Sequence, residues 1–168
     1  MPQSIDPKPL AEYRAALEKA EKDGSGNEEH GLEQIKGLLA DFSEENMSRA
    51  AEIYAADAFL NDTLKTVRGN QAIQDYFVET AESLVFARVT FQDTLRSSDG
   101  SYYLRWTMVM ESKVIRKKQK IETIGMSHLR FDLEGKVIVH QDFWDSCRGV
   151  FEHIPIVAAG IRIVKRRL

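Results

Sequence analysis

The spacing of apolar residues along the chain changes once, close to Leu84. Before that point, apolar side chains recur every three or four residues, as in helices that bury one face. This spacing predicts helices over about 9–21, over 28–41, over 43–56 and from Gly69 to about Leu84. The run 58–62 is apolar and then turns polar, which indicates a brief strand that leads into a loop.

After Leu84, apolar and polar residues alternate, which is the period of a strand with one buried face. The alternation predicts four long strands, over 85–95, 102–111, 121–132 and 136–146. A closing helix is predicted over 154–168, where the residues are apolar early and basic at the end. Helices followed by a strand meander indicate an α+β fold. We expect the helices to pack on one concave face of a curved, mostly antiparallel sheet.

The composition narrows the class of protein. The 168 residues are 43% hydrophobic, which suits one domain with a full core and excludes a disordered chain. Cys147 is the only cysteine, so a disulfide scaffold is excluded, and the net charge of −3 provides no basic field for nucleic acid. No apolar run approaches the roughly 20 residues of a membrane span, and residues 1–10 lack the pattern of a secretory signal. We therefore expect a soluble, cytoplasmic protein.

The first 27 residues differ in character from the rest. Pro9 suits the first turn of a helix that ends near Glu21, and a Gly- and Ser-containing stretch at 23–27 interrupts that helix. We divide the chain into an appended helix and linker over 1–27 and a main domain over 28–168. The appended helix is expected to pack on the main domain or on a second subunit.

Four strings within residues 32–147 resemble one family in their order and spacing. They are residues 50–59 (AAEIYAADAF), 68–73 (RGNQAI), 127–137 (SHLRFDLEGKV) and 140–145 (HQDFWD). The chain resembles the nuclear transport factor 2-like superfamily, in its SnoaL-like and ketosteroid-isomerase-like branch. The resemblance implies a cone-shaped half-barrel with a deep apolar cavity between sheet and helices. Any chemistry is expected in that cavity.

Asp62 follows the short strand. In the ketosteroid isomerases, the matching position holds an Asp that shuttles a proton between carbons of the steroid, so the resemblance implies a catalytic role for Asp62. The alternative is a turn residue whose carboxylate binds nearby backbone N–H groups, because Asp is favoured in turns.

The oxyanion hole of those isomerases is not retained. By the resemblance, its tyrosine falls on Leu38 and its protonated Asp falls on Ser127. Leu38 has no donor to offer, and Ser127 is expected to donate one hydrogen bond to a ligand oxygen. Steroid isomerisation is therefore not the expected reaction.

His140, Asp142 and Trp144 share one face of the last strand, because side chains alternate. SnoaL-like polyketide cyclases carry an acid/base Asp in this strand, and the resemblance matches it to Asp142. His140 would then orient this carboxylate or share its proton. In the alternative facing, Gln141 and Phe143 point inward, and the His–Asp pair lies on the outer face of the sheet.

Several further side chains are expected to contact a ligand in the cavity: Tyr54, Phe59, Trp106, Met108, Ser127 and Trp144. We expect no metal, because the four His are scattered without ligand spacing, and no organic cofactor, because no phosphate-binding glycine loop is present. The family implies a homodimer through the outer sheet face. For the helix over 154–168, cavity closure or dimer packing is favoured over a membrane surface, since the apolar run is short and the basic residues sit at one end.

Three functions remain open. The first is a cofactor-independent isomerase, cyclase or hydratase that acts on a small apolar ligand bearing a carbonyl, with Asp62 and Asp142 as proton carriers. The second is a module that binds a hydrophobic ligand without turnover. The third is a protein-association domain that uses the outer sheet face.

Overall fold

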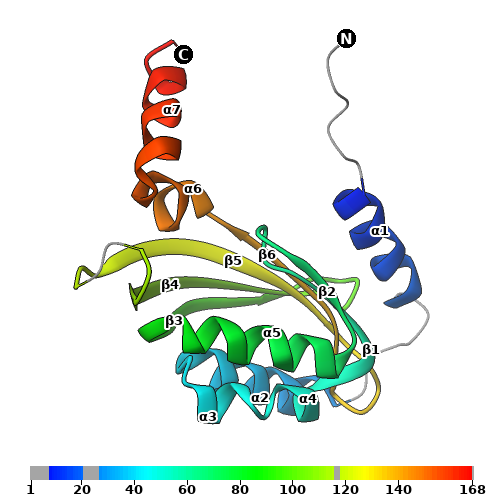
Figure 1. Cartoon of the computed structure of the whole chain (residues 1–168). Coiled ribbons are helices and arrows are strands. Elements are labelled where there is room, and N and C mark those ends of the chain that lie inside the picture. Colours follow the sequence, from blue (N-terminus) through cyan, green and yellow to red (C-terminus); the bar gives the residue numbers. More distant parts are fainter. Residues whose placement is uncertain (1–7, 21–26, 116–117, 168) are drawn as a thin grey trace.

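A curved six-stranded sheet lies at the centre of the computed structural model, which describes residues 8–20, 27–115 and 118–167 (Figure 1). The strand order is β2-β1-β6-β5-β4-β3, and the sheet stays open between its two edge strands. β1 runs parallel to β6, and all other neighbours are antiparallel. The strands are β1 (Tyr54–Asn61), β2 (Thr66–Arg68), β3 (Leu84–Arg96), β4 (Tyr102–Ser112), β5 (Ile121–Phe131) and β6 (Val137–Trp144).

Helices cover the concave face of this sheet and extend from both ends of the chain (Figure 1). They are α1 (Lys8–Ala20), α2 (Glu28–Ala40), α3 (Glu44–Met47), α4 (Ala50–Ile53), α5 (Asn70–Glu82), α6 (Ser146–Gly149), the 3₁₀ helix η1 (Phe151–His153) and α7 (Pro155–Lys165). The predicted α+β architecture, with a meander from β3 to β6, is confirmed.

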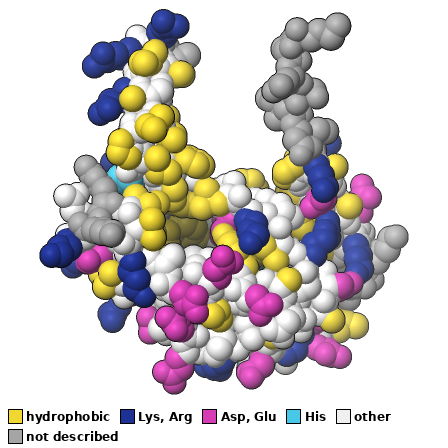
Figure 2. Space-filling view, in the orientation of Figure 1, with side chains coloured by type: hydrophobic (Ala, Val, Ile, Leu, Met, Phe, Trp, Pro, Cys, Tyr) yellow, Lys and Arg dark blue, Asp and Glu magenta, His cyan; other side chains and the backbone are white. Residues whose placement is uncertain are grey.

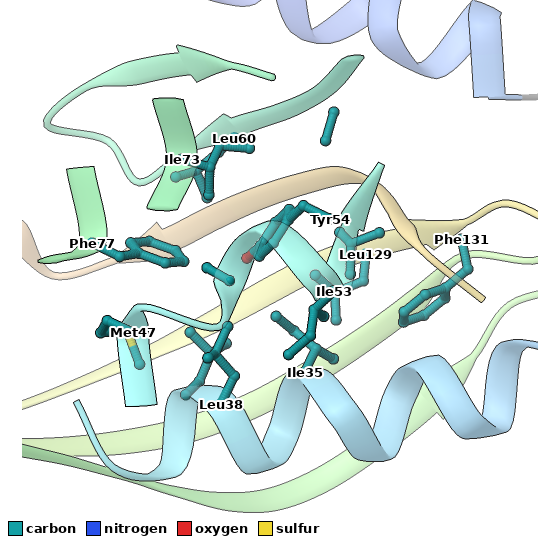
Figure 3. Close-up of a cluster of buried hydrophobic side chains, with 14 of the residues drawn as sticks. Ile35, Leu38, Met47, Ile53, Tyr54, Leu60, Ile73, Phe77, Leu129 and Phe131 are labelled. Atoms are coloured by element: carbon teal, nitrogen blue, oxygen red, sulfur yellow. The ribbon is translucent and has the colours of Figure 1, made fainter. Parts of the chain in front are cut away.

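The main core lies between α2–α5 and the inner face of the sheet (Figure 3). Ile35 and Ile73 come from the helices, and Leu60 and Leu129 come from the strands; none of the four exposes any measurable surface. The alternation along the strands and the helical spacing of 28–84 thus direct their apolar residues to the same layer.

The helix predicted over 43–56 is wrong in its second half. The Ser43 hydroxyl accepts a hydrogen bond from Asn46 N and caps α3. A second short helix, α4, then ends at Ile53, and the chain becomes β1 at Tyr54. The reason is tertiary: Tyr54 aligns with Val137 in the parallel pairing of β1 with β6, a partner that helical spacing cannot reveal.

α1 packs on the outer face of the sheet. Ala16 and Ala20 form a small apolar cluster with Phe59 and Val139. The Tyr13 hydroxyl lies 2.7 Å from His128 Nδ1 on β5. The N-terminal helix therefore covers part of the outer face, where the resemblance leads us to expect a dimer.

The helix predicted over 154–168 is α7 (Pro155–Lys165), and two short helical segments that the sequence did not indicate, α6 and η1, precede it. α6 begins because the Asp145 carboxylate accepts the N–H of Arg148 and caps it. Across the described residues 8–20, 27–115 and 118–167, no helix has the length and hydropathy needed to cross a membrane.

Candidate functional site

A cavity of about 290 Å³ opens between the inner face of the sheet and the helical layer. Most of its wall is apolar, and a hollow bordered by apolar side chains is visible on the surface in Figure 2. The polar side chains along the wall are those of Asp62, Tyr76, Thr80, Ser83, Ser112, Ser127, His140 and Asp142. The volume lies at the lower end of the roughly 300–1,000 Å³ of ligand pockets, so it suits a small molecule.

The facing of β6 decides between the two readings of its polar residues. His140, Asp142 and Trp144 line the cavity. Phe143 is 46% exposed on the opposite face, where the Gln141 amide binds Asn61 Oδ1. The structure thus adopts the inward facing of the His–Asp pair.

A chain of hydrogen bonds links five side chains along the wall of the cavity. The Tyr54 hydroxyl lies 2.7 Å from His140 Nδ1, and His140 Nε2 lies 2.9 Å from Asp142 Oδ1. Ser127 Oγ donates to the same Oδ1 at 2.5 Å, and Trp106 Nε1 donates to Ser127 Oγ at 2.9 Å. The elements β1, β6, β5 and β4 each supply a member, so the chain depends on the assembled sheet.

The protonation of Tyr54 sets the direction of this chain. Burial, helped by the negative charge of Asp142, raises the pKa of Tyr54 well above its usual value, so the hydroxyl keeps its proton. We therefore assign Tyr54 O–H as the donor to His140 Nδ1, which places the imidazole proton on Nε2, directed at Asp142. Tyr54 also stacks on the imidazole, with 6.1 Å between ring centroids.

The described residues bind only one oxygen of the Asp142 carboxylate. Both hydrogen bonds to its carboxylate, from His140 and Ser127, fall on Oδ1. Among the described residues, no donor reaches Oδ2. The side chain is 16% exposed at the cavity wall, so Oδ2 is the oxygen left for a ligand.

Asp62 combines the two roles weighed from the sequence. It lines the cavity at the end of β1, yet its Oδ1 accepts the backbone N–H groups of Leu64 and Lys65 at 2.9 and 2.8 Å. The hydroxyl of Tyr76 on α5 donates to Oδ2, and Trp144 Nε1 donates to the Asp62 carbonyl at 2.5 Å. Asp62 is therefore a turn residue that forms part of the cavity wall, with both carboxylate oxygens engaged.

Tyr76 is a site residue that the sequence pattern places only within the helix predicted from Gly69 to about Leu84. Burial, together with the charge of Asp62 and its hydrogen bond, raises the pKa of Tyr76 far above the usual value. The signal available in the sequence was a polar-tipped aromatic residue on a helix face that packs against the end of a strand. Buried tyrosine hydroxyls need a partner, and a strand-end carboxylate supplies one.

Four of the expected ligand contacts line the cavity: Trp106, Met108, Ser127 and Trp144. The other two, Tyr54 and Phe59, do not. Phe59 points to the outer face of β1, where it packs under α1, and Tyr54 lies fully buried behind His140. The expectation that Ser127 donates to a ligand also changes, because its proton already goes to Asp142.

Leu38, Arg105 and Arg130 are not among the residues that line the cavity. Leu38 packs in the core, 2% exposed. Arg105 pairs with Asp93 on the surface, and Arg130 bonds to the Ala20 carbonyl beneath α1. None of the described residues around the cavity is a Lys or Arg, and no three described His, Cys, Asp or Glu side chains lie close enough to hold a metal ion.

Residues 35–140 match the family model described as "SnoaL-like domain". No curated relative matches the sequence. Three solved structures share the fold at low identity. A Catenulispora acidiphila protein with a ketosteroid isomerase-like fold is 16% identical, has a TM-score of 0.62, and aligns over 72% of this chain and 92% of its own.

The other two structures are described as enzymes. The LEH-like epoxide hydrolase of Mycobacterium tuberculosis is 10% identical, with a TM-score of 0.58, over 80% of this chain and 93% of its own. SalBIII, described as an epoxide hydrolase/cyclase-like enzyme, is 14% identical, with a TM-score of 0.57, over 73% of this chain and 95% of its own. At these identities, the similarity extends to the fold and no further.

Proposed function

This chain belongs to the SnoaL-like domain family, and we propose that it is a cofactor-independent acid/base enzyme in which Asp142 moves a proton on a small apolar ligand that bears a carbonyl. The observation that carries the proposal is the position of Asp142. Its Oδ1 is held by His140 and Ser127, while its Oδ2 remains available at the wall of an apolar cavity.

The proposed step is an enolisation. Asp142 Oδ2 takes a proton from the carbon next to the carbonyl, and the electron pair of the broken C–H bond forms a C=C bond as the carbonyl becomes an enolate. The protonated Asp142 then returns the proton to the same carbon or to a second carbon of the ligand. His140 and Ser127 keep the carboxylate from rotating during both transfers, because both bind the other oxygen.

The apolar wall supports this role in a second way. Phe91, Trp106 and Met108 line the same cavity as the Asp142 carboxylate and make this part of its wall apolar. A ligand bound there meets Asp142 instead of solvent, and a hydrophobic body is needed to fill the volume. The flexible side chain of Met108 is compatible with several ligand shapes.

The experiment is solvent deuterium exchange. A panel of small apolar ketones and enones is incubated with the protein in D₂O, and incorporation next to the carbonyl is followed by NMR. Replacing the base with Asp142→Asn is expected to lower the exchange rate of any active ketone by at least about 100-fold. The matched control Asp93→Asn removes a surface carboxylate and should leave the rate unchanged. An equal rate in Asp142→Asn contradicts the proposal.

Asp62→Asn belongs in the same experiment. Because both carboxylate oxygens of Asp62 are engaged by Leu64, Lys65 and Tyr76, we expect this variant to lose stability while it keeps most of the exchange rate. A loss as large as that of Asp142→Asn in a folded protein would instead make Asp62 a second proton carrier.

Binding without turnover is the second candidate, and one observation favours it. The hydroxyl protons of Tyr76 and Ser127 and the indole N–H of Trp144 are all donated within the protein, so none of the three stands ready for a developing oxyanion. Ligand-observed NMR on the same panel distinguishes the two candidates. Saturation transfer to a ketone that shows no exchange supports binding alone.

A further inference from the structure

Helix α7 carries apolar side chains on one side and basic side chains on the other. Ile156, Ile163 and Val164 are 87%, 54% and 58% exposed. At the helical rotation of about 100° per residue, these three fall together in an arc of about 100°. Arg162 and Lys165 project from the opposite side of the helix. This pattern is typical of helices that lie at a lipid–water interface.

α7 also stands apart from the body of the molecule (Figure 1). Within α7, Ala158 is the one buried residue. An ion pair of 2.5 Å between Lys165 and Glu152 ties the helix to η1, the segment that precedes it. Its 11 residues extend about 16 Å, roughly half the hydrocarbon thickness of a bilayer, so α7 can lie on a membrane but cannot cross it.

The apolar side of α7 is continuous with the mouth of the cavity. Val150, just before η1, lines the cavity. Figure 2 shows apolar side chains running from α7 down to the hollow, with Lys and Arg side chains along the other flank of the helix. The sequence alone favours cavity closure or dimer packing by this helix, but in the structure Ile156, Ile163 and Val164 face solvent.

We propose that α7 docks the protein on the surface of an anionic phospholipid membrane. The apolar side enters the boundary between headgroups and acyl chains, and the basic side chains contact lipid phosphates. The charge argument is local: residues 155–167 contain Arg162, Lys165, Arg166 and Arg167 and no acidic residue, in a chain whose net charge is −3. A second copy of the chain would present the same basic helix, which has no acidic residue to pair with these basic side chains.

Docking in this way places the cavity mouth beside the membrane. A ligand that partitions into lipid would then reach Asp142 along an apolar path, without crossing water. This consequence rests on the proposed function and narrows its substrate to lipid-soluble ketones, whereas the docking itself does not depend on any reaction.

Vesicle sedimentation of the full chain tests the docking. Wild type is expected to bind phosphatidylcholine vesicles that contain phosphatidylglycerol, to bind pure phosphatidylcholine weakly, and to dissociate in high salt. The variant Arg162→Gln/Arg166→Gln, which leaves the Lys165–Glu152 ion pair intact, should bind roughly 10- to 30-fold more weakly to the anionic vesicles. Ile156→Ser/Ile163→Ser should lose at least about tenfold.

Leu133→Ser is the matched control, because Leu133 is equally exposed (62%) but lies in the turn between β5 and β6. It should bind as wild type does. Equal binding to both vesicle types, or unchanged binding of the α7 variants, overturns the proposal. So does a dimer in solution that the α7 variants dissociate while vesicle binding is absent, which would make a second copy the occupant. Exchange of water-soluble ketones should be unaffected in these variants, so failure of the docking and failure of the catalytic proposal remain distinguishable.

Discussion

His140 lies between Tyr54 and Asp142 and bonds to both, with less than 2% of its own side chain exposed. An imidazole in such a place has two neutral tautomers, and only one of them presents a proton to the carboxylate. The buried phenol of Tyr54 selects that tautomer by donating to Nδ1. Tyr54 is thus a positioning residue, which acts on Asp142 through the ring of His140.

The variant Tyr54→Phe tests this role. It keeps the ring but removes the donor, so His140 Nδ1 is left buried without a partner. We expect the free energy of unfolding, measured in urea, to fall by about 1–3 kcal/mol. The exchange rate should fall while ligand affinity stays constant, because the cavity wall is unchanged. A variant that loses stability alone would assign Tyr54 to the core and nothing more.

His128, a second buried histidine, makes the stability of the folded protein depend on pH. Burial lowers the pKa of His128 from 6.5 to about 4, since Tyr13 and Tyr103 enclose the ring and the nearby charge of Asp99 offsets only part of this. Arg130 and His140 oppose protonation further. The unfolded chain takes up this proton near pH 6.5 and the folded protein only near pH 4. The contribution of His128 to stability is therefore full above pH 6.5 and is lost as the pH falls from 6.5 to 4.

The loss should amount to about 2–3 kcal/mol of unfolding free energy between pH 7 and pH 4. Urea titrations of wild type, His128→Gln and the exposed-site control His30→Gln at both pH values measure it. His128→Gln should show a smaller difference between the two pH values than the other two proteins. Identical pH dependence in all three would place the acid-sensitive group elsewhere.

At the residue scale, the alternation along β6 was sufficient to group His140 with Asp142. The surroundings of Phe59 and the partners of Ser127 could not be predicted from the sequence. Phe59 looks like a cavity residue until the apolar cluster with Ala16 and Ala20 is known, because α1 turns the outer face of β1 into a second buried layer. The partners of Ser127 depend on which strands are neighbours, and sequence spacing does not encode that.

At the element scale, β5 brings two large indoles together by offering no side chain between them. A Cβ at Gly125 would lie 2.4 Å from ring carbons of Trp106 and 2.7 Å from the Cβ of Trp144. Trp106 comes from β4 and Trp144 from β6, the neighbours on either side. The glycine therefore allows both rings to line the cavity at this point.

Gly125→Ala is expected to push Trp106 away and to disturb its hydrogen bond to Ser127. The unfolding free energy should fall by about 1–3 kcal/mol, and ligand binding should weaken with it. The control Gly37→Ala adds a methyl group on α2 where no atom lies within 4 Å, so it should be neutral or stabilise by up to about 1 kcal/mol. Thermal and urea denaturation of both variants check this. Equal stability of the two variants would mean that the rings adapt freely.

The helices and strands of the main domain were predicted to within a few residues wherever one hydrophobic period, helical or alternating, persists along the whole element. The exception, 43–56, contains Tyr54, a residue type found on buried helix faces and in strands alike. Its outcome is fixed by pairing with a strand some 80 residues later, so no local pattern carries it.

For the molecule as a whole, the outer sheet face remains our proposed site of homodimerisation, reduced to the part that α1 leaves open. Ile124, Met126 and Phe143 are 66%, 39% and 46% exposed there. We expect light scattering to report a dimer that Met126→Ser/Phe143→Ser dissociates, with the exchange reaction retained per subunit. A monomer at every accessible concentration would rule this interface out.

The parallel pairing of β1 with β6 also has a consequence for the order in which the protein takes shape during synthesis. β1 leaves the ribosome long before β6. Asn61 can therefore pair with Gln141 only after α5, β3, β4 and β5 have been made. Closing so long a loop is slow compared with forming the hairpins of the meander. Asp62 follows β1 and Asp142 lies on β6, so the two carboxylates can line one cavity only after all the strands between them have been made.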